Sequence, residues 1–155
     1  MTSVPLEERY WEDYAAGTVQ QFAGVTMNEP DIIAFAKQYD PQPFHIDPIA
    51  ARQSMYGGLI ASGWHTAAVT MRVLVDQFIP PKASLGSPGI DELRWVLPVR
   101  PGDTLSVQVE IVEARRSRSK PDQGIVRTRI SVLNQTGAVV MTLAAANFFK
   151  CRNPA

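Results

Sequence analysis

The sequence has little cysteine and little histidine, and it contains no long apolar run. Its 155 residues include one cysteine and two histidines. A single cysteine excludes an internal disulfide and a cysteine cage around a metal ion. No apolar stretch approaches the roughly 18 residues that a membrane-spanning helix needs. Residues 1–14 include four acidic side chains and no apolar segment typical of a signal peptide. We therefore predict no membrane span and no secretory signal.

The chain also has no excess of charge of either sign. Fifteen Lys and Arg residues balance fifteen Asp and Glu residues, and the calculated pI is about 6.7. A protein that binds nucleic acid without regard to sequence needs clustered positive charge, so the balance argues against this class. A chain of this length buries roughly 68–70% of its unfolded surface. We expect one globular, cytoplasmic domain over residues 1–155, with residues 1–14 peripheral to it.

The first half of the chain has helical patterns. After a weak strand signal at 18–25, Asn28 resembles an N-cap, and the helix after it must end near Asp40 because Pro41 follows. Asp47 followed by proline predicts a second, short helix. The longest helix is expected over 62–79, with Ser62 as its N-cap. Its predicted apolar face consists of Trp64, Ala67, Ala68, Met71, Leu74, Val75 and Phe78.

The second half alternates with the period of a β-strand. Apolar and polar residues alternate over 93–97 and 105–111, and further strands are expected over 125–133 and 138–150. The segments 100–103 and 134–137 have the composition of tight turns, and a charged stretch occupies 113–123. Helices followed by strands joined through short turns predict an α+β fold with an antiparallel sheet. The long helix is available to cover that sheet.

Asp40 and His45 are the first candidate for chemistry. Two prolines, Pro41 and Pro43, stiffen the segment between them. A rigid bridge of this kind can direct a carboxylate and an imidazole into one space, where they could hold a water and move its protons. The spacing alone is also compatible with a structural role, in which Asp40 caps a turn and His45 hydrogen-bonds a buried carbonyl.

A second candidate is the start of the long helix, where Gly63 follows Ser62. A glycine in the first helical turn leaves its N–H unobstructed, and the helix dipole adds positive potential there. Such an amide can polarise a carbonyl oxygen. Gly57, Gly58 and Gly63 are also compatible with tight turns and close packing alone.

Taken together, these motifs resemble a known family. The pattern Asp-x-x-Pro-x-His-x-Asp at 40–47 is followed by a small residue and glycine opening a long helix, and then by Pro-Val-x-Pro-Gly-Asp-Thr-Leu at 98–105. This order resembles the MaoC-like dehydratases, which are hot-dog-fold (R)-specific enoyl-CoA hydratases. The resemblance extends from about Asn28 to Phe149.

The resemblance implies a single hot-dog domain in which a curved antiparallel sheet wraps a long central helix. It also implies a homodimer, or a larger homo-oligomer built from dimers, with sites near the interface. Matched by motif position, Asp40 and His45 would be the catalytic pair, and the Gly63 N–H would bind the thioester oxygen. Gln42, Phe44 and Ser62 depart from the residues usual at their positions, and they are expected to line the substrate site.

The expected activity is reversible addition of water to a trans-2-enoyl-CoA, giving an (R)-3-hydroxyacyl-CoA. No metal or redox cofactor is expected, and coenzyme A is regarded as part of the substrate. The expected partner is therefore a small acyl thioester, with no nucleic acid and no membrane. A hot-dog acyl-CoA thioesterase and a non-catalytic module that binds acyl thioesters are the alternatives.

Other features have simpler interpretations. His65 could be imagined in a zinc site with His45 and Asp47, but no spacing typical of zinc ligands is present. Asp47 is interpreted as a helix cap. The basic cluster, defined as Arg115, Arg116, Arg118 and Lys120, could meet phosphates of coenzyme A or could form a solvated hairpin.

Overall fold

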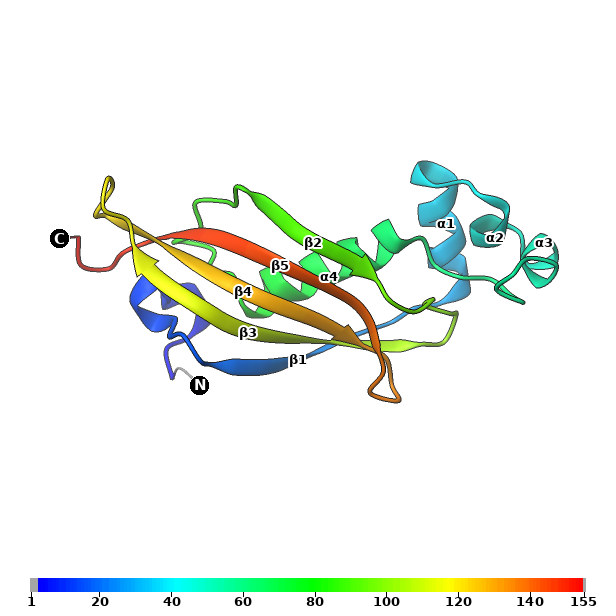
Figure 1. Cartoon of the computed structure of the whole chain (residues 1–155), viewed down its shortest axis with the longest axis horizontal. Helices are drawn as coiled ribbons and strands as arrows, with labels where there is room; N and C mark the ends of the chain where they lie inside the picture. The colour runs from blue at the N-terminus through cyan, green and yellow to red at the C-terminus, as the bar shows by residue number, and fades with distance from the viewer. Residues whose placement is uncertain (1–2, 155) are drawn as a thin grey trace.

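The structure is a computed structural model that describes residues 3–154. Within this range, two short 3₁₀ turns precede the first strand, three helices follow it, and a fourth, longer helix leads into four further strands (Figure 1). The elements are η1 (Leu6–Glu8), η2 (Trp11–Asp13), β1 (Val19–Thr26), α1 (Glu29–Tyr39), α2 (Pro43–Ile46), α3 (Pro48–Arg52), α4 (Gly63–Gln77), β2 (Gly89–Trp95), β3 (Thr104–Arg116), β4 (Gln123–Leu133) and β5 (Val139–Lys150).

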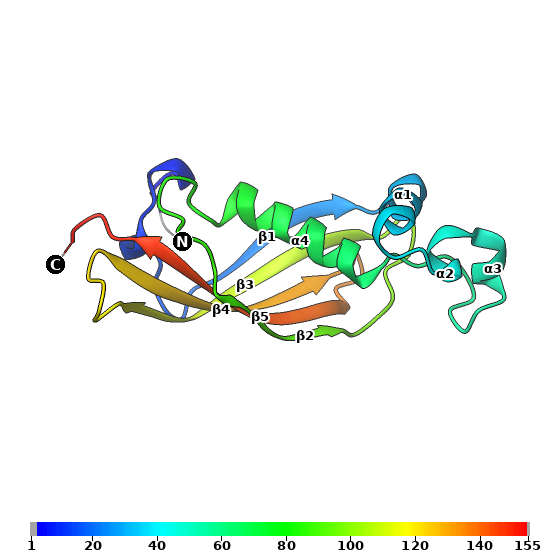
Figure 2. The same cartoon turned by 90° about the horizontal axis from the view of Figure 1, so that it is seen from above.

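The strands form one antiparallel sheet in the order β1-β3-β4-β5-β2. Helix α4 lies along one face of this curved sheet, and α1, α2 and α3 gather beyond one end of it (Figure 2). Alternate side chains of β3, including Val107 and Val109, are buried between the sheet and the helix. The α+β architecture and the covering helix are therefore confirmed. No helix within residues 3–154 has the length and apolarity needed to cross a membrane.

Three helices begin at the caps that the sequence indicates. Asn28 accepts a hydrogen bond from the Asp31 amide at 2.9 Å, and Asp47 accepts one from the Ile49 amide at 2.9 Å. Ser62 accepts one from the Trp64 amide at 3.3 Å. Each cap satisfies a backbone donor that the first turn of a helix leaves without a partner. These local contacts fix where α1, α3 and α4 start, and therefore where the segments between them run.

The predicted apolar face of α4 is wrong in part. The side chains of Trp64, Met71 and Val75 are about half exposed, whereas Thr66 and Thr70 are buried against the sheet. A threonine can occupy the buried face because its methyl group packs there while its hydroxyl bonds within the helix. The Thr70 hydroxyl donates to the Thr66 carbonyl oxygen at 2.8 Å. The helix is consequently rotated from the expected orientation, and an apolar stripe faces outward.

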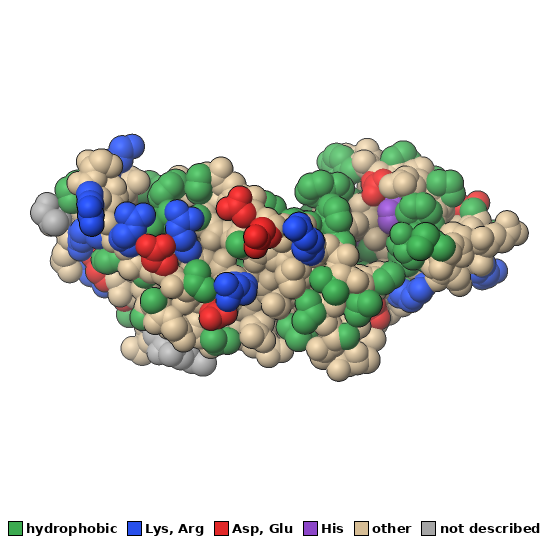
Figure 3. Space-filling view, viewed as in Figure 1, with side chains coloured by type: hydrophobic (Ala, Val, Ile, Leu, Met, Phe, Trp, Pro, Cys, Tyr) green, Lys and Arg blue, Asp and Glu red, His purple; other side chains and the backbone are tan. Residues whose placement is uncertain are grey.

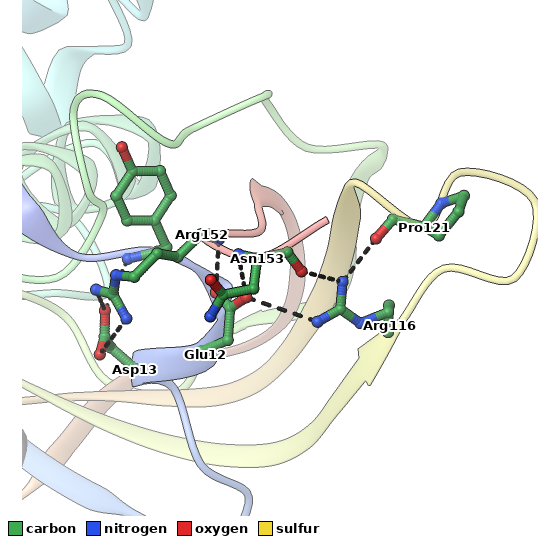
Figure 4. Close-up of polar contacts among 7 residues, drawn as sticks. Glu12, Asp13, Arg116, Pro121, Arg152 and Asn153 are labelled. Carbon is green, nitrogen blue, oxygen red and sulfur yellow. Dashed lines mark hydrogen bonds and ion pairs between the residues drawn. The ribbon is translucent and has the colours of Figure 1, made fainter. Parts of the chain in front are cut away.

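The N-terminal segment contacts the rest of the protein through residues 11–14. Tyr14 is buried in the core, and the Trp11 ring lies against Gly124 of β4. Close to it, the Glu12 carboxylate accepts from the amides of Arg152 and Asn153 at 2.8 and 3.0 Å. Asp13 accepts from the Arg152 guanidinium at 2.6 Å (Figure 4). These contacts fasten the N-terminal turns to the segment that follows β5.

Candidate active site

Asp40 and His45 lie side by side. Asp40 is the C-cap residue of α1, and His45 belongs to α2, so a turn between two helices joins them. The Asp40 Oδ2 and His45 Nε2 atoms are 3.3 Å apart. The sequence predicts a stiff loop here, but the structure forms one helical turn from Pro43, because proline is favoured at the first helical position. The predicted convergence of the two side chains holds even though the bridge between them is partly helical.

Two neighbouring side chains hold the Asp40 carboxylate. The Gln42 amide donates to Oδ1 and the Ser62 hydroxyl donates to Oδ2, each at 2.7 Å. Partial burial raises the pKa of Asp40, but these two hydrogen bonds outweigh that effect, and a protonated His45 lowers the pKa further. The pKa of this carboxyl therefore lies below its ordinary value, and Asp40 is ionised at neutral pH.

The His45 ring is buried and anchored through its other nitrogen. Its Nδ1 atom lies 2.8 Å from the carbonyl oxygen of Ile60, which can only accept a hydrogen bond. We assign the Nδ1–H tautomer on this basis, which leaves Nε2 of neutral His45 as an acceptor. Nε2 and the Asp40 carboxylate are then two acceptors facing the same space. A water molecule has two protons with which to satisfy both.

Gly63 supplies a free donor at the start of α4. It is the first residue of the helix, and its N–H donates to no residue within 3–154. A Cβ atom added to Gly63 would lie 2.3–2.5 Å from three atoms of the Trp95 indole. The contact with Trp95 of β2 therefore requires glycine at this position. The structure brings this amide to the same cavity as Asp40 and His45.

The cavity that these groups share has a volume of about 610 Å³. Apolar and aromatic side chains form most of its wall. Figure 3 shows a histidine beside an acidic side chain in a hollow bordered by hydrophobic residues, near the end of the molecule that carries α1, α2 and α3. The lining residues are Tyr39, Asp40, Gln42, Phe44, His45, Tyr56, Ile60, Ala61, Gly63, Trp64, Thr66, Trp95, Val96, Leu97, Pro98, Val99 and Val140.

The remaining predicted site residues fall into two groups. Gln42 and Phe44 line the cavity, and the Phe44 ring contacts the His45 ring edge-on with centroids 4.6 Å apart. Ser62 is fully buried and lies outside the lining. Its hydroxyl donates a hydrogen bond to Asp40 Oδ2, so Ser62 positions the carboxylate and does not face the cavity.

Neither His65 nor the basic cluster is among the residues that line the cavity. His65 stacks face to face on Phe35, with centroids 4.7 Å apart, and joins α4 to α1. Residues 3–154 contain no group of three or more His, Cys, Asp or Glu side chains placed to hold a metal ion. The basic cluster lies around the turn between β3 and β4, at the end of the molecule opposite α1–α3 (Figure 1). There Arg116 donates to the carbonyl oxygens of Pro121 and Asn153 (Figure 4).

Comparison with known proteins identifies the family. The model of the MaoC-like domain matches residues 13–133, which is most of the chain. The chain belongs to the MaoC-like family.

Its MaoC-like relatives include proteins of known structure. A MaoC-like dehydratase from Rhodospirillum rubrum is 43% identical, with a TM-score of 0.86 over 94% of this chain and 99% of that one. The (R)-hydratase of A. caviae, involved in PHA biosynthesis, is 26% identical, with a TM-score of 0.72 over 88% and 97% of the two chains. The 3-hydroxybutyryl-CoA dehydratase of Methylorubrum extorquens is 30% identical over 70% of this chain and 67% of its own length. The MaoC-like chain thus has the hot-dog fold.

Trp95 and Thr66 are two of the residues of the MaoC-like cavity that the sequence analysis did not predict. Trp95 lies on the edge strand β2, and its ring covers Gly63, although 32 positions separate the two in the chain. No local pattern signals such a contact. The sequence does contain a signal for Thr66. It follows Gly63 by three residues, and residues at this spacing share one face of a helix. The apolar pattern led instead to Trp64 and Ala67 as the inward residues.

Proposed function

We propose that this MaoC-like protein catalyses reversible hydration of a trans-2-enoyl thioester to an (R)-3-hydroxyacyl thioester. One observation carries the proposal. An ionised carboxylate and the Nε2 acceptor of an imidazole face one space at 3.3 Å, in a cavity that also contains the free amide of a helix start. Asp40, His45 and Gly63 are the residues that supply these three groups.

Asp40 and His45 activate the water. The water donates one proton toward Asp40 Oδ2 and the other toward His45 Nε2, which leaves a lone pair of its oxygen free to attack C3. As the C3–O bond forms, the pair takes up one proton from the water, and it delivers one proton to C2. The pair titrates as a coupled unit, so the base and acid roles belong to both residues together.

Gly63 stabilises the charge that develops in this reaction. Electrons of the C2=C3 bond move toward the thioester, and negative charge accumulates on its carbonyl oxygen before C2 is protonated. The Gly63 amide, at the positive end of the α4 dipole, donates to that oxygen. Loss of one such donor typically lowers the rate by about 10²–10³. Since these residues supply both the proton transfers and the charge stabilisation, the proposed reaction needs no cofactor.

The substrate is proposed to be an acyl-CoA. The (R)-hydratase and the 3-hydroxybutyryl-CoA dehydratase among the relatives support this class of substrate and this reaction. The apolar wall formed by Val96, Leu97 and Pro98 suits the hydrocarbon part of an acyl chain. In the competing thioesterase reaction coenzyme A is the leaving group. Release of its free thiol therefore distinguishes thioester hydrolysis from hydration.

We also propose that the protein acts as a homodimer. Strand β2 is an edge of the sheet, and Ile90 and Trp95 on it are about half exposed. The outward stripe of α4, consisting of Trp64, Met71 and Val75, adds further exposed apolar surface. An unpaired edge strand flanked by apolar side chains favours association with a second copy. Sedimentation of the wild type and of Val75→Glu at micromolar concentration tests this, and a monomeric wild type would contradict it.

Crotonyl-CoA provides the test of the activity. We expect loss of the enoyl-thioester ultraviolet absorbance without release of free thiol, which is trapped in a parallel reaction. Thiol release in step with the absorbance change would indicate a thioesterase. Binding of several acyl-CoAs without either change would indicate a non-catalytic module. Chirality of the product, determined by chromatography, tests the (R) assignment.

A further inference from the structure

Thr66 places a free hydroxyl group in the wall of the cavity. Its side chain is about 98% buried, and it is one of the residues that line the 610 Å³ space. The backbone groups of Thr66 are occupied, since its amide donates to Ser62 and its carbonyl oxygen accepts from Thr70. The hydroxyl itself has no hydrogen-bond partner within residues 3–154. The hydroxyl is therefore available to bond with a group that occupies the cavity.

The Thr66 hydroxyl differs from the other buried polar atoms that have no partner. Thr128 Oγ1 and His65 Nδ1 are sealed inside the protein, out of reach of solvent. Thr66 Oγ1 is not among the sealed atoms of residues 3–154, and the cavity is the open space that Thr66 borders. The hydroxyl therefore opens onto the cavity, where a ligand atom can reach it.

Thr66 lies one helical turn after Gly63 on α4. Residues three apart on a helix are neighbours, about 5–6 Å from each other, and helical side chains tilt toward the N-terminus. A carbonyl oxygen has two lone pairs roughly 120° apart, so two hydrogen bonds of about 2.9 Å to it place their donors about 5 Å from each other. Both donors border the same cavity. One carbonyl oxygen can therefore accept from the Gly63 N–H and the Thr66 O–H together.

We infer that Thr66 is a second donor to the thioester oxygen and thus a catalytic residue. The inference rests on the proposed hydration, in which that oxygen gains negative charge. The Thr66 O–H donates to it beside the Gly63 N–H, and the proton stays on the hydroxyl throughout. Because the charge is largest in the transition state, the hydroxyl contributes more to kcat than to binding of the substrate.

Thr66→Val is the decisive variant, because valine has nearly the same shape and lacks the hydroxyl. We expect kcat on crotonyl-CoA to fall about 10- to 10³-fold, with KM changing less than threefold. Thr66→Ser restores the hydroxyl and is expected to recover most of the loss. Thr70→Val is the matched control, since it removes a hydroxyl from the same helix face one turn further on, outside the cavity lining. Its kcat is expected to stay within a factor of two of the wild type.

Longer enoyl-CoAs separate this role from recognition of the acyl chain. A donor to the thioester oxygen gives the same fold loss for Thr66→Val at every chain length. Wild-type kcat in Thr66→Val, or a loss that varies strongly with chain length, would overturn the inference while leaving the hydration proposal intact. A wild type that hydrates none of the enoyl-CoAs would instead refute the proposed function on which the inference rests. Thermal unfolding of each variant checks that the fold is retained.

Discussion

Asp40→Asn removes the charge of the proposed catalytic carboxylate while keeping its size. In the wild type, Oδ1 accepts from Gln42 and Oδ2 accepts from Ser62, and Oδ2 also faces His45 Nε2. An asparagine can keep its oxygen toward Gln42. Its NH₂ group then replaces Oδ2, where it can donate to Ser62, whose hydroxyl rotates, or to His45 Nε2. The substitution thus removes one acceptor for the water and occupies the other.

The expected loss follows from that geometry. Removing a positioned acid or base typically costs about 10²–10⁴ in rate, so kcat on crotonyl-CoA is expected to fall by that factor. This corresponds to about 3–5 kcal/mol of activation free energy, at about 1.4 kcal/mol for each factor of ten. Stability should change much less, by about 1 kcal/mol, because the asparagine keeps most of the hydrogen bonds. That change lowers the Tm by about 2–4 °C for a chain of this size.

Initial rates from the loss of enoyl-thioester absorbance measure the effect, and thermal unfolding measures the stability. Asp76→Asn is a matched control, because Asp76 pairs with Arg72 on the exposed side of α4, away from the cavity. It should retain the wild-type rate. An Asp40→Asn enzyme that folds and turns over at nearly the wild-type rate would refute the assignment of Asp40 to the chemistry.

Further predictions concern the groups around the pair. Ser62→Ala removes the hydrogen bond to Asp40 and the N-cap of α4 together, so we expect a lower kcat and a loss of about 1 kcal/mol in unfolding free energy. Gly63→Ala keeps the backbone amide but drives the added methyl group into the Trp95 ring, so the activity should fall. The double variant Gly63→Ala/Trp95→Leu should recover part of that activity. No recovery would show that the contact with Trp95 is not the cause of the loss. The pKa values of Glu12 and Asp13 are lowered in the folded state, because hydrogen bonds donated by Arg152 and its neighbours outweigh the effect of burial. Their stabilising contribution is therefore present above the unfolded pKa of about 4 and is lost as the pH falls below it. Arg152→Ala should lower the Tm at pH 7 and narrow the difference in Tm between pH 7 and pH 3, as thermal unfolding at both pH values can determine.

The sequence predicted the elements well where the signal is local. Asn28, Asp47 and Ser62 are capping residues whose partners lie two or three positions away, and all three caps form. The strands were recognised because alternation along β3 and β4 reflects burial of one face. Strand β3 nevertheless continues to Arg116, into the charged stretch that is expected to separate it from β4. The hydrogen bonds between β3 and β4 can extend there because a sheet does not need both faces buried.

Local patterns could not predict the orientation of α4 or the hydrogen bonds that hold Asp40 beside His45. Thr70 packs inward because the helix satisfies its hydroxyl internally, and Thr66 is buried beside the cavity, whereas Trp64 and Met71 face outward. A hydrophobicity pattern ranks these residues in the opposite order. Likewise, the hydrogen bond from Ser62 to Asp40 joins residues 22 positions apart. Such contacts depend on how α1 and α4 meet, which is a property of the tertiary packing.

The central claim is that one water molecule, held by Asp40 and His45, adds across the double bond of an enoyl thioester. Conversion of crotonyl-CoA in deuterated, ¹⁸O-labelled water tests it most directly, with the product analysed by mass spectrometry and NMR. We predict ¹⁸O in the C3 hydroxyl group of an (R)-3-hydroxyacyl-CoA, with deuterium added at C2 on the same face as that oxygen. Appearance of ¹⁸O in a free carboxylate, or addition of deuterium on the opposite face, would contradict the account.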